Sequence, residues 1–243
     1  MNLLQDKTAI VYGAAGPVGA AVAGAFAGAG ARVALAGRTL RPLAEVAERI
    51  RDAGGHAEAA VVDVLDAPAV RAHAAGVAAA SGRIDIAFNA TGNDDRQGTP
   101  LLDMEFADFA RPVSKVIATH FTIATVTARY MTERGGVILA LGGGREAIPS
   151  LGGSHVAWSA LAGLCRQLAA ELGPSGIRVA WLLSPGSPDP GRPVSADELA
   201  GQTLLGRRPS YADVANAAVF AASDWAVTMT ATEINLTGGA VID

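Results

Sequence analysis

Two neighbouring side chains, Ser154 and His155, are the clearest candidates for proton chemistry in this chain. An imidazole titrates near neutral pH and can act as an acid or a base, whereas a serine hydroxyl alone can only orient a substrate or a water molecule. A hydrolytic triad is poorly supported, because the two residues are adjacent and no strand-to-helix nucleophile elbow surrounds them. Metal binding has little support, since the single cysteine and the spacing of the four histidines offer no pair of ligands on one helix face.

A glycine-rich turn at residues 13–19, GAAGPVG, could bind a phosphate group. It follows a buried apolar run and leads directly into an Ala-rich helical segment. Glycine removes side chains that would block a pyrophosphate, and the N–H groups of the helix point toward it. Such turns also close ordinary strand-to-helix connections, but the position after the first strand favours dinucleotide binding. The expected backbone contacts are Gly13, Ala15, Gly16, Val18 and Gly19.

The elements that must hold these residues alternate along the chain. We expect strands at Thr8–Tyr12, Arg32–Ala36, Ala59–Val62, Ile84–Asn89, Val137–Leu141, Arg178–Leu183 and Glu233–Leu236. We expect helices at Val18–Ala29, Leu40–Ala53, Ala69–Ala80, Phe106–Thr132, Ala157–Leu172 and Tyr211–Ser223. This alternation requires parallel strands joined by right-handed crossovers. The sequence therefore predicts a single-domain α/β fold, a doubly wound, Rossmann-like parallel sheet with helices on both faces, spanning residues 1–243.

Composition narrows the class of protein. The 243 residues are half hydrophobic, enough for one large core, yet no apolar run approaches the ~18 residues that a membrane span needs. The N-terminus lacks a secretory pattern and the lone Cys165 cannot form an internal disulfide, so we expect a soluble, cytoplasmic protein. A net charge of -4 with scattered arginines argues against nucleic-acid binding.

Residues 184–210 are rich in Pro, Gly and Ser and show no clear period. A short helix is expected near residues 196–203. One interpretation is a surface connection; the other, which long loops in compact domains favour, is a lid over a substrate.

Several motifs, which together cover nearly the whole chain, resemble those of the short-chain dehydrogenase/reductase family. Residues 12–19 are similar to the family's Thr-Gly-x-x-x-Gly-x-Gly, with Pro17 at the middle glycine. Residues 85–92 resemble the segment ending Asn-Asn-Ala-Gly, and residues 168–179, LAAELGPSGIRV, are close to common family sequences. The resemblance implies a nicotinamide dinucleotide cofactor. It assigns further cofactor contacts to Asp63 and Val64, to Asn89, Ala90 and Gly92, and to Pro185 and Gly186.

The choice of cofactor is read after the second strand, where an acidic side chain would bind the ribose 2′-hydroxyl. This chain has Gly37-Arg38-Thr39 there, and a guanidinium beside a small residue can pair with a 2′-phosphate. We therefore favour NADP(H) over NAD(H), with Arg38 and Thr39 as contacts. The alternative is that Arg38 only caps the next helix.

The residues that the family uses for catalysis are replaced. Aligning the neighbouring motifs places the family's Tyr on Ser154, its Lys on Trp158, its Ser on Gly143 and its Asn on Val116. Pro188 stands where a backbone N–H usually holds the nicotinamide carboxamide, and proline has no such group. The adenosine end therefore matches the family, and the nicotinamide end does not.

Four residues are expected to line the substrate pocket: Asp94, His120, Gly143 and Trp158. Asp94 begins the run Asp-Asp-Arg after Gly92, on a loop that borders the substrate in the family. Trp158 could close the pocket, form an aromatic wall for a flat or cationic ligand, or simply pack on its helix. For His120 and His155 the alternative to catalysis is a packing or surface role.

These features predict an NADP(H)-dependent oxidoreductase with an atypical active site, which transfers hydride to a small organic C=O, C=N or C=C group. Water, Ser154 or His155 would deliver the proton. The alternative is a non-redox protein on the same scaffold, either a nucleotide-binding pseudoenzyme or partner subunit, or a redox-neutral enzyme. Because family members commonly pair the two long helices expected at residues 106–132 and 157–172, the resemblance also implies a homodimer or homotetramer.

Overall fold

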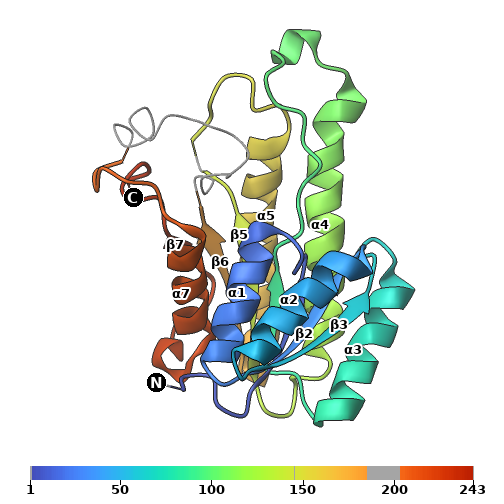
Figure 1. Ribbon diagram of the computed structural model, residues 1–243. Helices are drawn as coiled ribbons and strands as arrows, with labels where there is room; N and C mark the ends of the chain where they lie inside the picture. Colours follow the sequence, from blue (N-terminus) through green and yellow to red (C-terminus); the bar gives the residue numbers. More distant parts are fainter. Residues whose placement is uncertain (1, 145, 185–202, 243) are drawn as a thin grey trace.

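The computed structural model describes residues 2–144, 146–184 and 203–242 of the chain (Figure 1). Within them a seven-stranded sheet has the order β3-β2-β1-β4-β5-β6-β7, and every neighbouring pair is parallel. The strands are β1 (Thr8–Tyr12), β2 (Arg32–Gly37), β3 (His56–Val61), β4 (Ile86–Asn89), β5 (Gly136–Gly142), β6 (Ile177–Leu183) and β7 (Thr232–Asn235). The predicted doubly wound, single-domain α/β fold is thereby confirmed.

Helices cover both faces of this sheet. The α-helices are α1 (Pro17–Gly28), α2 (Leu40–Asp52), α3 (Ala67–Ser81), α4 (Phe106–Ala128), α5 (Ser154–Leu172) and α7 (Tyr211–Ala222), with short 3₁₀ turns η1 (Leu101–Asp103), η2 (Gly173–Ser175) and η3 (Asp224–Ala226). One core lies under α1, α2 and α7, and the other under α3, α4 and α5. β1 shows why its sequence is apolar throughout, since Ala9 and Val11 enter the first core and Ile10 and Tyr12 the second. In Figure 1, α4 rises well beyond the edge of the sheet.

Three predicted boundaries were wrong by three residues or more. The long helix expected to reach Thr132 ends at Ala128, and Met131 in the turns that follow is fully buried. β3 begins at His56 rather than Ala59, because it pairs with β2 from its first residue; its exposed, alternating pattern hid this start. The helix expected from Ala157 begins at Ser154.

The predicted lid at residues 184–210 lies largely outside the described residues, as does the short helix expected near residues 196–203. Both stay predictions.

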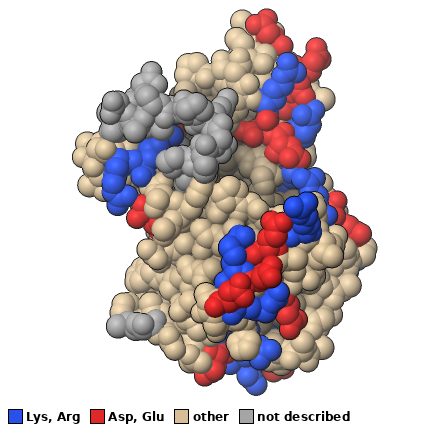
Figure 2. All heavy atoms as spheres, in the orientation of Figure 1, with Lys and Arg blue, Asp and Glu red and all other residues tan. Residues whose placement is uncertain are grey.

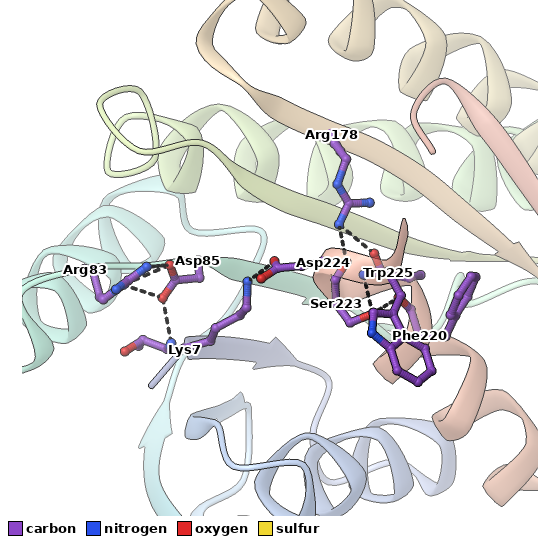
Figure 3. Close-up of polar contacts among 10 residues, drawn as sticks. Lys7, Arg83, Asp85, Arg178, Phe220, Ser223, Asp224 and Trp225 are labelled. Atoms are coloured by element: carbon purple, nitrogen blue, oxygen red, sulfur yellow. Dashed lines mark hydrogen bonds and ion pairs between the residues drawn. The ribbon is translucent and has the colours of Figure 1, made fainter. Parts of the chain in front are cut away.

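Polar contacts at the amino ends of the strands join β1 to the start of β4, and β6 to the end of α7 (Figure 3). The carboxylate of Asp85, at the start of β4, accepts hydrogen bonds from the backbone N–H of Thr8 at 2.7 Å and from Arg83 Nε at 2.8 Å. Arg178 of β6 donates to the carbonyl oxygens of Ala221 at 2.9 Å and Ser223 at 3.3 Å, at the end of α7. Because ligands of such folds bind at the carboxyl ends of the strands, this opposite edge has a structural role.

Candidate functional site

The glycine-rich turn lies at the carboxyl ends of the strands, between β1 and β4, where the order of strands reverses. Gly13 has a φ of +77°, and a Cβ there would lie 2.7 Å from the carbonyl carbon and oxygen of Ala90. Only glycine therefore lets the turn meet the segment after β4. The N–H groups of Gly13 and Ala14 donate to the carbonyl oxygen of Ala36, at 2.9 and 3.2 Å, which anchors the turn to β2.

The amino end of α1 is open. Its N-cap residue is Gly16, Pro17 begins the helix, and no described side chain caps the first turn. The first N–H groups of a helix lack partners within it and carry the positive end of its dipole. Together with the expected contacts at Ala15, Val18 and Gly19, this end of α1 fits a pyrophosphate.

The segment after β4 forms a second wall. The Asn89 side-chain oxygen accepts from the backbone N–H of Thr91 at 3.0 Å and from its hydroxyl at 2.7 Å, which fixes the turn. Asn89 Nδ2 is buried and has no hydrogen-bond partner within the described chain. A Cβ at Gly92 would meet nothing within 4 Å, so the backbone there faces open space. This arrangement fits a ligand that lies along residues 89–92.

The residues expected around the adenosine lie at the same edge. Val64 is buried, and the exposed Asp63 uses one carboxylate oxygen to accept from the backbone N–H of Leu65 at 3.0 Å. Arg38 and Thr39 are exposed. The N-cap of α2 is Thr39 rather than Arg38, so the capping role considered for Arg38 is not the one that the structure shows.

Asp94 lies beside several cationic side chains, and the sequence did not indicate this contact. Its carboxylate pairs with Lys115 Nζ of α4 at 2.5 Å, and the Lys115 side chain is only 11% exposed. Lys115, through this hydrogen bond and its charge, holds the pKa of Asp94 below its usual range, and Arg38 and Arg111 add to the lowering. Lys115 shares its helix face with Asp108, Arg111 and Thr119, so no local pattern in the sequence indicated this contact.

Ser154 is fully buried at the start of α5. Its hydroxyl donates to Asp95 Oδ2 at 2.5 Å, and Gln97 Nε2 donates to the same carboxylate oxygen at 2.5 Å. The hydroxyl proton of Ser154 is therefore committed to Asp95. Asp95 was expected only to lie on the loop after Gly92, and Gln97 was assigned no role. Their contacts with α5 join segments almost sixty residues apart, which no local pattern reveals.

Close packing seals Ser154 from one side. A Cβ at Gly153 would lie 1.9 Å from the carbonyl oxygen of Phe109 in α4. The N–H of Gly98 donates to the carbonyl oxygen of Ser150 at 2.8 Å. The segment before α5 is thus held against both α4 and the loop that carries Asp95.

Trp158 lies directly on Gly143. A Cβ at Gly143 would be 2.1 Å from Cε2 of the indole, so any larger residue there would clash with the ring. The half-buried Trp158 therefore fills the space beside the carboxyl end of β5. These two departures from the expected pattern depend on each other sterically.

The two candidate histidines have different surroundings. His120 is 7% exposed, its Nδ1 lies 2.9 Å from the carbonyl oxygen of Val116, and its Nε2 is buried without a partner in the described chain. Burial lowers the pKa of His120 to about 4, so its imidazole is neutral near pH 7. His155 is half-buried, and among the described residues no hydrogen bond joins its ring to Ser154.

Comparison with known proteins decides the family. Residues 13–241 match the family model described as enoyl-(acyl carrier protein) reductase. The chain belongs to the short-chain dehydrogenase/reductase family. The resemblance expected from the motifs is thus confirmed, and with it a family of oxidoreductases whose members use NAD(P)(H).

Individual relatives match this family member over nearly its whole length. It is 32% identical to the uncharacterized oxidoreductase YxbG of Bacillus subtilis, over 98% of this chain and 92% of the relative. It is 31% identical to D-threitol dehydrogenase of Mycolicibacterium smegmatis, over 98% and 94%. Among solved structures, a 7α-hydroxysteroid dehydrogenase complexed with NADH and 7-oxo glycochenodeoxycholic acid superposes with a TM-score of 0.87, at 27% identity, covering 100% of this chain and 97% of the other.

Some expected site features of this family member lie outside the described residues, namely Pro188 and the cofactor contacts Pro185 and Gly186. Elsewhere in the described parts, no three His, Cys, Asp or Glu side chains gather as a candidate metal site. The same parts contain no helix that is both long and apolar enough to cross a membrane.

Proposed function

We propose that this protein is an NADP(H)-dependent oxidoreductase with an atypical active site, acting on a small organic C=O, C=N or C=C group. The observation that carries the proposal is the uncapped amino end of α1 on the glycine turn, at the point where the strand order reverses. Arg38, one residue beyond β2, supports the phosphorylated cofactor over the unphosphorylated one.

The bound nicotinamide would supply or accept the hydride. The turn and α1 would hold the pyrophosphate, and Arg38 the 2′-phosphate. The Asp95–Ser154 pair would orient a water molecule, and that water or the imidazole of His155 would supply the proton that reduction requires. The indole of Trp158 would limit the space beside Gly143. A positioned acid contributes about 10²- to 10⁴-fold in rate, and proximity can contribute more, so loss of a strong acid still permits hydride transfer.

One observation favours a non-redox protein as the second candidate. The Trp158 indole occupies the space over Gly143, and Ser154 is buried beneath the Asp95 loop. If these contacts leave no room for a nicotinamide ring, the protein binds the adenosine part of a nucleotide and acts as a pseudoenzyme, a partner subunit or a redox-neutral enzyme.

Calorimetric titration with NADPH and, separately, NADH tests the proposal. We expect micromolar affinity for NADPH and weaker binding of NADH, followed by NADPH consumption with at least one member of a panel of imines, enones and ketones. Nucleotide binding without consumption would favour the second candidate. If neither NADPH nor NADH binds, both candidate functions are contradicted, because each requires a bound nucleotide.

We also propose that the protein forms a homodimer or homotetramer through α4 and α5. These helices pack on each other and expose large apolar side chains, with Phe121 52% and Val156 42% exposed.

On the face drawn in Figure 2, basic and acidic side chains are interspersed rather than separated by sign. No broad basic surface on that face favours a nucleic-acid partner.

A further inference from the structure

We propose that Asp94 is a resident anion in a phosphate site formed by Arg38 and Lys115, and that it limits the preference for a cofactor carrying a 2′-phosphate. This inference rests on the proposed nucleotide binding. It concerns residues on three separate segments: Arg38 after β2, Asp94 after β4, and Lys115 in α4. β2 and β4 are the two neighbours of β1 in the sheet, so Arg38 and Asp94 follow strands that flank the one leading into the glycine turn.

Lys115 is the less expected member of the site. Its side chain is 11% exposed, and its Nζ lies 2.5 Å from Asp94 Oδ2. A nearly buried ammonium needs an anionic partner, because burial removes most of the water that would solvate its charge. The Lys115 ammonium could therefore pair with a phosphate bound at Arg38 as well as with Asp94.

Asp94 is held among cations at a position that a ligand can reach. It is 52% exposed and lies on a loop, where its φ of +56° falls in the left-handed region that Asp and Asn tolerate better than most residues. Lys115, Arg38 and Arg111 all stabilise its charged form. Basic and acidic side chains lie intermixed over α4 and the segment before it in Figure 2.

A 2′-phosphate would compete with this carboxylate. Near neutral pH the phosphate carries more charge than the carboxylate and offers more acceptor oxygens. While Asp94 stays in place, it neutralises Lys115 and repels a phosphate bound at Arg38. Removing the charge of Asp94 leaves Arg38 and Lys115 both available for the phosphate.

Two small ligands isolate this effect, namely 2′,5′-ADP and 5′-AMP, which differ only in the 2′-phosphate. We expect Asp94→Asn to tighten 2′,5′-ADP binding by about fivefold and to leave 5′-AMP within about twofold, since an exposed ion pair is worth up to about 1 kcal/mol. Asparagine keeps the shape and tolerates the left-handed backbone. Lys115→Met should weaken 2′,5′-ADP binding by about fivefold, because Asp94 then remains without its partner.

Asp103→Asn is the matched control, because it removes one exposed carboxylate from η1, the 3₁₀ turn that precedes α4. It should change neither affinity. Calorimetry on the full-length protein, with circular dichroism to confirm folding, separates the outcomes. If Asp94→Asn changes both ligands equally, or changes neither, the inference is overturned and nucleotide binding stands. If wild type and variants are folded and bind neither ligand nor NADPH, the proposed function itself is overturned.

Discussion

At the scale of single residues, Trp158 and Gly143 form one steric unit. We predict that Gly143→Ala lowers the free energy of unfolding by about 1–3 kcal/mol, because the new methyl group overlaps the indole. In a Trp158→Ala background the same substitution should cost little, so a double-mutant cycle in urea would give a coupling of similar size. Gly144→Ala is the control, since a Cβ there meets nothing within 4 Å. Additive effects of the two substitutions would contradict the steric unit.

His120 gives a second prediction at this scale. Burial lowers its pKa from 6.5 to about 4, so the unfolded chain takes up a proton at a higher pH than the folded protein does. The free energy of unfolding should therefore fall as pH drops from about 6.5 toward 4, and the total loss attributable to His120 should be about 3 kcal/mol. Urea titrations of wild type and His120→Gln between pH 7 and pH 4 would measure this loss as the difference between their free energies of unfolding at each pH.

The exposed His56 provides the control for His120, because His56→Gln removes an imidazole from the surface rather than from the core. His73 also has a pKa lowered by burial, but it is present in every variant and cancels in the comparison. Parallel curves for wild type and His120→Gln would contradict the buried, neutral state of His120.

At the scale of elements, Asp85 links β1 and β4 at the edge of the sheet opposite the site. Asp85→Ala should lower the free energy of unfolding by about 2–3 kcal/mol, because the Thr8 N–H loses its acceptor in a buried position. Asp224→Ala, which removes an exposed ion pair with Lys7, should cost less than about 1 kcal/mol. Urea unfolding measures both, and NADPH affinity should be unchanged in each. A large loss of affinity in Asp85→Ala would show that this edge communicates with the site.

The sequence predicts elements better than the contacts between them. The glycine turn and the apolar strands carry local signals, so β1, α1 and the order of elements were correctly predicted. The edge strand β3 and the amino end of α5 carry weaker signals, because their polar and small residues match turns as well as regular structure. The Lys115–Asp94 and Asp95–Ser154 contacts depend on how α4 and α5 lie against the loop after β4, and no local pattern encodes that packing.

At the scale of the whole molecule, the exposed apolar residues on α4 and α5 give a prediction about assembly. Stable interfaces bury about 800 Å² on each partner and carry apolar residues at their centre. We predict that light scattering at micromolar concentration gives the mass of a dimer or tetramer, and that Phe121→Glu shifts it toward the monomer, because two like charges would meet across a symmetric interface.

The comparison variant for assembly is Val61→Glu, which places the same charge on a similarly exposed residue, 58% against 52%, at the edge strand β3. It should leave the mass unchanged. Phe121 lies about 9 Å along α4 from Lys115 and on another side of the helix. Phe121→Glu should therefore also leave the affinity for NADPH within about twofold, which would show that the site is complete in one chain. A monomeric mass for the wild type would refute the assembly, and a loss of NADPH binding on dissociation would mean that the partner chain supports the cofactor site.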